Sequence, residues 1–106
     1  MTAQQAVTQA LAWFDSGAFR HTLARRVAYA TESQRQDRDA VLADYLNQEI
    51  APPLAEMGFS LQWLDNPEAA NRPFLIAARI EDPALPTLLC YGHGDVVTGD
   101  AEGWRD

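Results

Sequence analysis

The feature that most constrains the fold is a change of hydrophobic period at Gly58. Before this glycine, apolar residues recur three and four positions apart, which is the spacing of one face of an α-helix. After it, short apolar runs alternate with turn signals such as the Asp-Asn-Pro of residues 65–67, which is typical of β-strands. The sequence therefore predicts helices followed by strands.

Three helices are expected in the first half. Thr2 is suited to cap the first helix, and Gly17 is suited to end it in a left-handed conformation. The second helix is expected from about Ala18 and the third from about Asp37. A proline pair at 52–53 interrupts the third, because proline has no N–H to donate, so we expect a kink or a restart there.

Three strands are expected in the second half, at 59–64, 74–80 and 87–91. The last is a continuous apolar run, Thr-Leu-Leu-Cys-Tyr, of the kind found in a strand buried on both faces, so Cys90 is predicted to be a buried, unreactive thiol. The expected fold class is α/β or α+β, and residues 1–106 are expected to form one small domain or a piece of a larger one.

Composition excludes several classes of function. The chain has 106 residues, of which 15 are acidic and 8 basic, and its net charge is -7. Such an acidic chain is poorly suited to bind nucleic acid or an anionic membrane surface. A single cysteine and the lack of a basic, apolar leader at the N-terminus lead us to expect a cytoplasmic protein.

One short constellation carries recognisable chemistry. The apolar run 87–91 is followed by Gly92, His93, Gly94 and Asp95. In extended backbone, residues two apart point to the same side, so the carboxylate is expected beside the imidazole ring. Histidines that bind metals usually donate their second N–H to such a carboxylate. The alternative is an ordinary turn in which the aspartate accepts hydrogen bonds from local N–H groups.

The wider string is similar to a known motif. Residues 88–97 read LLCYGHGDVV and are followed by Trp104. This resembles the first metal-site motif, Gly-His-x-Asp-Val-Val after an apolar strand, of the dizinc exopeptidase and amidohydrolase family. Members include carboxypeptidase G, aminoacylase, acetylornithine deacetylase, succinyl-diaminopimelate desuccinylase and carnosinase. The upstream layout agrees, with Thr-Glu-Ser at 31–33 and Gly-Phe at 58–59. Only 88–97 is specific.

The resemblance implies a fold and an activity. The strands would be a three-stranded part of a zinc-exopeptidase-type mixed sheet, in a truncated α/β/α sandwich, and residues 1–106 the N-terminal part of a metallopeptidase catalytic domain. His93 would bind zinc, or cobalt in its place, and Asp95 would orient its ring. The implied substrates are small peptides or N-acyl amino acids, whose amide bond is hydrolysed.

The same resemblance implies that most of the site lies elsewhere. The family also uses a bridging Asp, a Glu-Glu pair that includes the general base, another carboxylate and a second His, all expected beyond Asp106. A catalytic zinc needs about three protein ligands. The only other histidine, His21, is expected on a solvated helix surface. We therefore expect this chain alone to bind zinc weakly or not at all and to be inactive.

Further hypotheses concern assembly and the alternatives to an enzyme. A sheet that ends after three strands exposes an edge, which favours a homodimer. Trp13, Phe14 and Trp63 are expected in the core or in a subunit interface. A rival to the enzyme hypothesis is a self-standing, non-catalytic interaction module in which His93 and Asp95 are relics in a turn. In a third, two chains combine their His93 side chains to hold a metal on the dimer axis.

Overall fold

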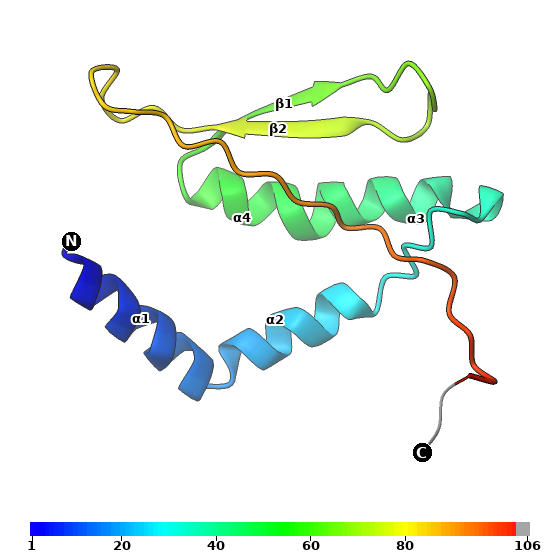
Figure 1. Ribbon diagram of the computed structural model, residues 1–106, viewed down its shortest axis with the longest axis horizontal. Helices are drawn as coiled ribbons and strands as arrows, with labels where there is room; N and C mark the ends of the chain where they lie inside the picture. Colours follow the sequence, from blue (N-terminus) through cyan, green and yellow to red (C-terminus); the bar gives the residue numbers. More distant parts are fainter. Residues whose placement is uncertain (104–106) are drawn as a thin grey trace.

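The computed structural model describes residues 1–103 and has an α/β composition. A rod of consecutive helices lies between a two-stranded hairpin and a V-shaped helix pair (Figure 1). The change from helices to strands falls near Gly58, as the change of period predicts. In chain order the elements are α1 (Ala3–Asp15), α2 (Ala18–Val27), the 3-10 helix η1 (Gln36–Arg38), α3 (Asp39–Asp44), the π-helix η2 (Tyr45–Ile50), α4 (Ala51–Glu56), β1 (Ser60–Leu64) and β2 (Phe74–Ala78).

α1 begins and ends where the sequence predicts. The Thr2 hydroxyl accepts a hydrogen bond from the Gln5 N–H at 3.2 Å, and the Gln5 side chain accepts one from the Thr2 N–H at 2.7 Å. This reciprocal capping box satisfies two donors that the first turn leaves without partners. Gly17 lies between α1 and α2 with φ 81°, a conformation in which a side chain would be strained. Both predictions are confirmed.

The proline pair is accommodated by a π-helical turn. η2 leads directly into α4, and Pro52 and Pro53 occupy the first positions of α4. The first turn of an α-helix does not use its N–H groups, so prolines are tolerated there. The wider π-turn changes the hydrogen-bond pattern just before them. The expected restart therefore occurs at Ala51, and α3, η2 and α4 form one continuous rod (Figure 1).

Within residues 1–103 the sheet has two strands, whereas the sequence predicts three. β1 and β2 pair antiparallel from Ser60 opposite Ala78 onwards. The segment 87–93 makes no backbone–backbone hydrogen bond to any described residue. The prediction of a third strand at 87–91 is therefore wrong within residues 1–103. An apolar run favours an extended backbone, but a strand also needs N–H and C=O groups of a neighbour, and no described backbone offers them here.

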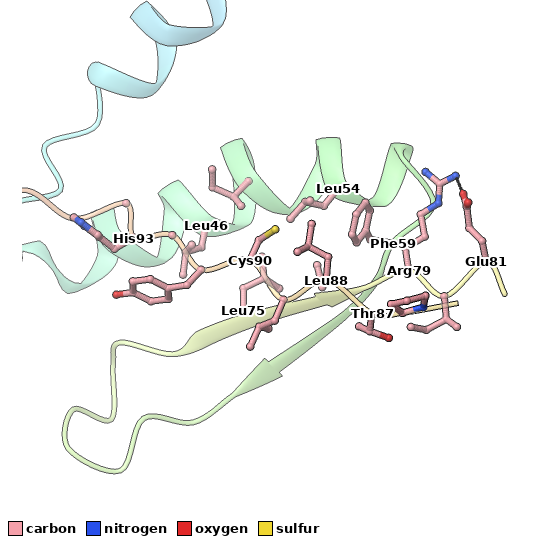
Figure 2. A pocket seen from close by; sticks show the side chains of 18 of the residues that line it. Leu46, Leu54, Phe59, Leu75, Arg79, Glu81, Thr87, Leu88, Cys90 and His93 are labelled. Atoms are coloured by element: carbon pink, nitrogen blue, oxygen red, sulfur yellow. Dashed lines mark hydrogen bonds and ion pairs between the residues drawn. The ribbon is translucent and has the colours of Figure 1, made fainter. Parts of the chain in front are cut away.

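The same segment is exposed where burial was expected. Leu88, Leu89 and Tyr91 are 85%, 92% and 88% exposed. Cys90 is exposed too, so the prediction of a buried thiol is wrong. The segment borders two open grooves of about 880 and 640 Å³, each lined by side chains of the helical rod and of β2. Figure 2 shows Leu88 and Cys90 directed towards the rod, with Leu75 of the hairpin on the other side. Burial on both faces would require neighbouring strands and a further layer.

Few apolar side chains are fully buried in the part of the chain that is described. Ala51 is the one hydrophobic residue of 1–103 in this class. Trp13 and Phe14 each place their ring 5.5 Å from that of Phe19, at the corner between α1 and α2. These rings and Trp63 remain exposed. Of the two positions predicted for the aromatic residues, the core is therefore excluded here, and a subunit interface stays a prediction.

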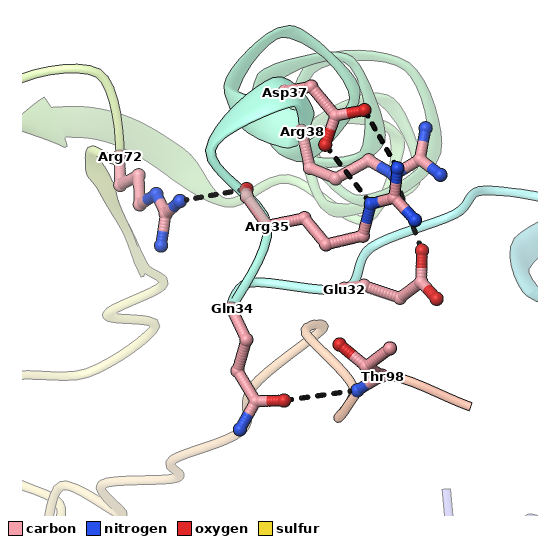
Figure 3. A network of polar contacts seen from close by, with 7 residues as sticks. All are labelled: Glu32, Gln34, Arg35, Asp37, Arg38, Arg72 and Thr98. Carbon is pink, nitrogen blue, oxygen red and sulfur yellow. Dashed lines mark hydrogen bonds and ion pairs between the residues drawn. The ribbon is translucent and has the colours of Figure 1, made fainter. Parts of the chain in front are cut away.

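Arg72 ties the loop before β2 to the segment between α2 and α3. Its Nε donates to Oδ1 of Asp39 at 2.8 Å. Its Nη2 donates to the Arg35 carbonyl at 3.3 Å (Figure 3). The hydrogen bond from Arg72 holds the pKa of Asp39 below its usual value of 3.8. The ionised carboxylate is thus the form that the fold stabilises.

We expect the Arg72–Asp39 ion pair to make the folded chain less stable in acid. Because the pKa of Asp39 is lower in the folded chain, its contribution is present above the unfolded pKa of 3.8 and is lost as pH falls through the folded pKa. Thermal unfolding at a series of pH values should therefore show a shallower acid limb for Asp39→Asn than for the wild type. Asp44→Asn, an exposed change on the same helix, controls for the loss of one negative charge. Identical acid limbs for Asp39→Asn and the wild type would contradict the prediction.

None of the helices in residues 1–103 is long and apolar enough to cross a membrane.

Candidate metal site

The turn that carries His93 is held by the segment that follows α2. The Val96 N–H donates to the Thr31 carbonyl at 2.9 Å, and the Ser33 N–H donates to the Val96 carbonyl at 3.3 Å, which makes a short parallel bridge. The Thr31 hydroxyl donates to the Gly94 carbonyl at 2.7 Å. Thr31 is 3% exposed, so water has little access to compete for these bonds.

Asp95 lies beside the ring of His93, as the two-residue spacing predicts. Its Oδ1 and its backbone carbonyl oxygen each lie 3.1 Å from Nδ1 of His93. Both oxygens accept hydrogen bonds, so Nδ1 carries the proton when the ring is neutral. The lone pair of Nε2 is then available to a ligand, and the His93 side chain is 67% exposed. This arrangement suits a metal-binding histidine that is oriented by a carboxylate.

The second oxygen of the Asp95 carboxylate is also bound. Oδ2 accepts a hydrogen bond from the Ser33 hydroxyl at 2.6 Å. This bond is the main cause that lowers the pKa of Asp95 below its usual value of 3.8, and the hydrogen bond with His93 adds to it. The carboxylate is therefore ionised at neutral pH and can accept from both neighbours. Sequence reasoning missed Ser33, which lies 62 residues away from Asp95 along the chain.

At Gly94 the turn lies against the helical rod. A Cβ atom at this position would overlap the ring of Tyr45, which would lie 2.8 Å away at Cδ1. The Tyr45 ring packs against that of Tyr29, with 5.7 Å between centroids, so moving it aside would disturb this aromatic pair. The sequence favours glycines at 92 and 94 as room for a second backbone or a substrate, and it did not identify the Tyr45 ring, which lies far away in the chain.

Gly94→Ala is expected to destabilise the chain by roughly 2 kcal/mol, because an added methyl group in a filled contact forces its neighbours apart. The same change should move the backbone amide signals of His93 and Asp95. Urea unfolding and amide NMR spectra measure the two effects. Gly92→Ala is the matched control, since a Cβ atom there meets nothing within 4 Å. Equal stability of the two variants would contradict the contact with Tyr45.

The remaining candidate residues do not join this site. His21 is exposed on α2, as predicted. Residues 1–103 contain no group of three or more His, Cys, Asp or Glu side chains that is placed to hold a metal ion. Trp104, which belongs to the motif, lies outside the described residues. Within residues 1–103 the turn thus presents one imidazole nitrogen, on a ring oriented by a carboxylate, to a ligand.

Compared with models of protein families, with curated proteins and with solved structures, the chain matches none.

Proposed function

We propose that this chain supplies the first metal ligand of a zinc-dependent metallopeptidase or amidohydrolase. The reaction would be hydrolysis of the amide bond of a small peptide or an N-acyl amino acid. The observation that carries the proposal is the hydrogen bond between Nδ1 of His93 and the Asp95 carboxylate, which leaves the Nε2 lone pair to a ligand on a side chain that is 67% exposed. The resemblance of 88–97 to the family motif supplies the choice of zinc and of substrate class.

His93 and Asp95 would have different roles at the metal. Nε2 of His93 would donate its lone pair to the ion. Asp95 would hold the ring and keep its proton on Nδ1, which increases the basicity of Nε2. Zinc, when bound, lowers the pKa of its water to about 7 and so provides a nucleophile at neutral pH. A general base and further ligands must come from groups other than these two, since a catalytic zinc takes about three protein ligands.

The proposal includes a larger sheet. In the complete catalytic domain, segment 87–91 would be a strand of a mixed sheet within an α/β/α sandwich. Its backbone makes no backbone–backbone hydrogen bond within residues 1–103, and open grooves lie beside it; both observations support this. Leu46 of the rod and Leu75 of β2 line both grooves, so added strands would meet apolar side chains. For residues 1–106 alone we propose weak zinc binding and no hydrolysis.

A second candidate is a non-catalytic interaction module that forms a homodimer. It is favoured by the apolar side chains that α1 exposes, including Leu11 at 59% and Phe14 at 60%. Sedimentation combined with metal analysis tests this module on the isolated chain. A dimer of twice 11.7 kDa that binds no zinc supports the module, whereas a monomer excludes it.

The enzyme is tested on the protein in its native cells. An antibody raised against this chain should detect a protein several times larger than 11.7 kDa. The immunopurified protein should contain zinc and hydrolyse dipeptides or N-acyl amino acids. A chelator should abolish this activity, and added zinc should restore it. A band at 11.7 kDa without zinc or hydrolysis would overturn the proposal.

A further inference from the structure

We propose that Ser33 is a positioning residue: its hydroxyl holds the Asp95 carboxylate and thereby keeps the proton of the neutral His93 ring on Nδ1. The purpose of this arrangement, an Nε2 that can bind a metal, rests on the proposed function. The arrangement itself rests on a chain of hydrogen bonds, from the Ser33 hydroxyl to Oδ2 of Asp95 at 2.6 Å and from Nδ1 of His93 to Oδ1 at 3.1 Å.

A carboxylate beside a histidine is not oriented by that contact alone. Rotation about its Cβ–Cγ bond is broad, and the two oxygens exchange places readily. The side chain of Asp95 is 43% exposed, so water also competes for its oxygens. A serine hydroxyl has a single O–H to donate, and Ser33 donates it to Oδ2. Holding Oδ2 in place directs Oδ1 at the imidazole.

The hydroxyl of Ser33 is presented by an anchored backbone. The Ser33 N–H donates to the Val96 carbonyl at 3.3 Å, and Nη1 of Arg72 donates to the Ser33 carbonyl. Arg72 is in turn bound to Asp39 at 2.8 Å. On the other side of the motif, the Thr98 N–H donates to the Gln34 side chain at 3.2 Å (Figure 3). The segment around Ser33 therefore holds the histidine turn independently of the Ser33 side chain.

This independence separates positioning from a structural role. The backbone bonds of Ser33 and the Thr31 hydroxyl, which donates to the Gly94 carbonyl, keep the turn docked. Removing the Ser33 hydroxyl leaves these bonds in place and deletes only the bond to Asp95. The tautomer of a neutral histidine is set by the hydrogen bond that one of its nitrogens makes. An imidazole without such a restraint carries its proton mainly on Nε2.

The tautomer can be measured by NMR on the full chain with ¹⁵N-labelled histidine, without any metal. With the ring in its neutral form, in a sample at about pH 8.5, His93 should show a protonated Nδ1 and an unprotonated Nε2. The exposed His21 provides an internal reference for an unrestrained ring. In Ser33→Ala, the two His93 nitrogen shifts should move part of the way to those of His21, because the Asp95 backbone carbonyl, 3.1 Å from Nδ1, remains as an acceptor. Ser33→Thr, which keeps a hydroxyl, should restore them.

Two further variants keep the test decisive. Thr31→Val removes the other hydroxyl that reaches the turn. In the folded variant, identified by its amide spectrum, the His93 tautomer should be unchanged. If Ser33→Ala does not fold, Ser33→Cys retains the size with a weaker donor, and its nitrogen shifts should lie between those of wild type and His21. A folded Ser33→Ala or Ser33→Cys chain with wild-type His93 shifts overturns the proposal.

Failure of this inference is distinguishable from failure of the proposed function. The tautomer shift reports only on the bonds among Ser33, Asp95 and His93. The zinc content of the native protein reports on the metal site. A tautomer that depends on Ser33 in a protein without zinc would keep the positioning role and remove its catalytic purpose.

Discussion

His93→Ala in the native protein is expected to remove most of its zinc and to lower amide hydrolysis at least about 100-fold. Changes to groups that only orient a metal ligand cost about 10–100-fold in affinity or activity, so loss of the ligand itself should cost no less. Metal analysis of the purified variant and kcat/KM for an N-acyl amino acid measure the two effects. Asp95→Ala should give the smaller loss, about 10–100-fold, because the ligand atom remains.

His21→Ala is the matched control for this experiment. His21 is the other histidine of the chain, lies exposed on α2 and takes no part in the turn that carries His93. Its loss should leave zinc content and hydrolysis unchanged. Wild-type zinc in His93→Ala would exclude the metal-ligand role, and it would also exclude a shared metal held by the His93 residues of two chains.

Arg25→Ala is expected to lower the free energy of unfolding by about 3 kcal/mol. Nε of Arg25 donates to both carboxylate oxygens of Glu49, at 2.9 and 2.8 Å. The Glu49 side chain is 7% exposed, whereas that of Arg25 is 48% exposed. Loss of the arginine leaves a charged carboxylate without its partner in a place that water barely reaches. Since Arg25 lies on α2 and Glu49 on η2, the same change should loosen the helix pair from the rod.

Changing the other partner, Glu49, should lower the free energy of unfolding by less, and the difference between the two variants tests the pair. In Glu49→Gln the remaining amide is neutral and can still accept from Arg25, whose exposed guanidinium is solvated in either case, so we expect a loss of about 1 kcal/mol. Arg20→Ala, an exposed change on the same helix, controls for the loss of a positive charge. Urea unfolding of the three variants gives the order. A larger loss for Glu49→Gln than for Arg25→Ala would contradict the burial of the carboxylate.

Local features of this chain were predictable because their causes lie within a few residues. The cap at Thr2 and the left-handed Gly17 depend on neighbours in the same turn of chain. The positions of β1 and β2 follow from apolar runs bounded by turn residues. The contact between His93 and Asp95 also belongs to this group, since it follows from the alternation of side chains in extended backbone.

The errors and omissions concern contacts between distant parts of the chain. The run 87–91 has the composition of a buried strand, but pairing and burial depend on what lies beside it, and Cys90 is exposed for the same reason. Ser33 reaches Asp95 across 62 positions, and Gly94 meets a ring of the helical rod. Composition and spacing encode local conformational preference, whereas these contacts arise when separate elements pack together. The chain's own sequence thus specified the helices, the two hairpin strands and the His–Asp pair. Packing leaves the run 87–91 unpaired in the described chain, brings the Ser33 hydroxyl to Asp95 and places Gly94 against Tyr45.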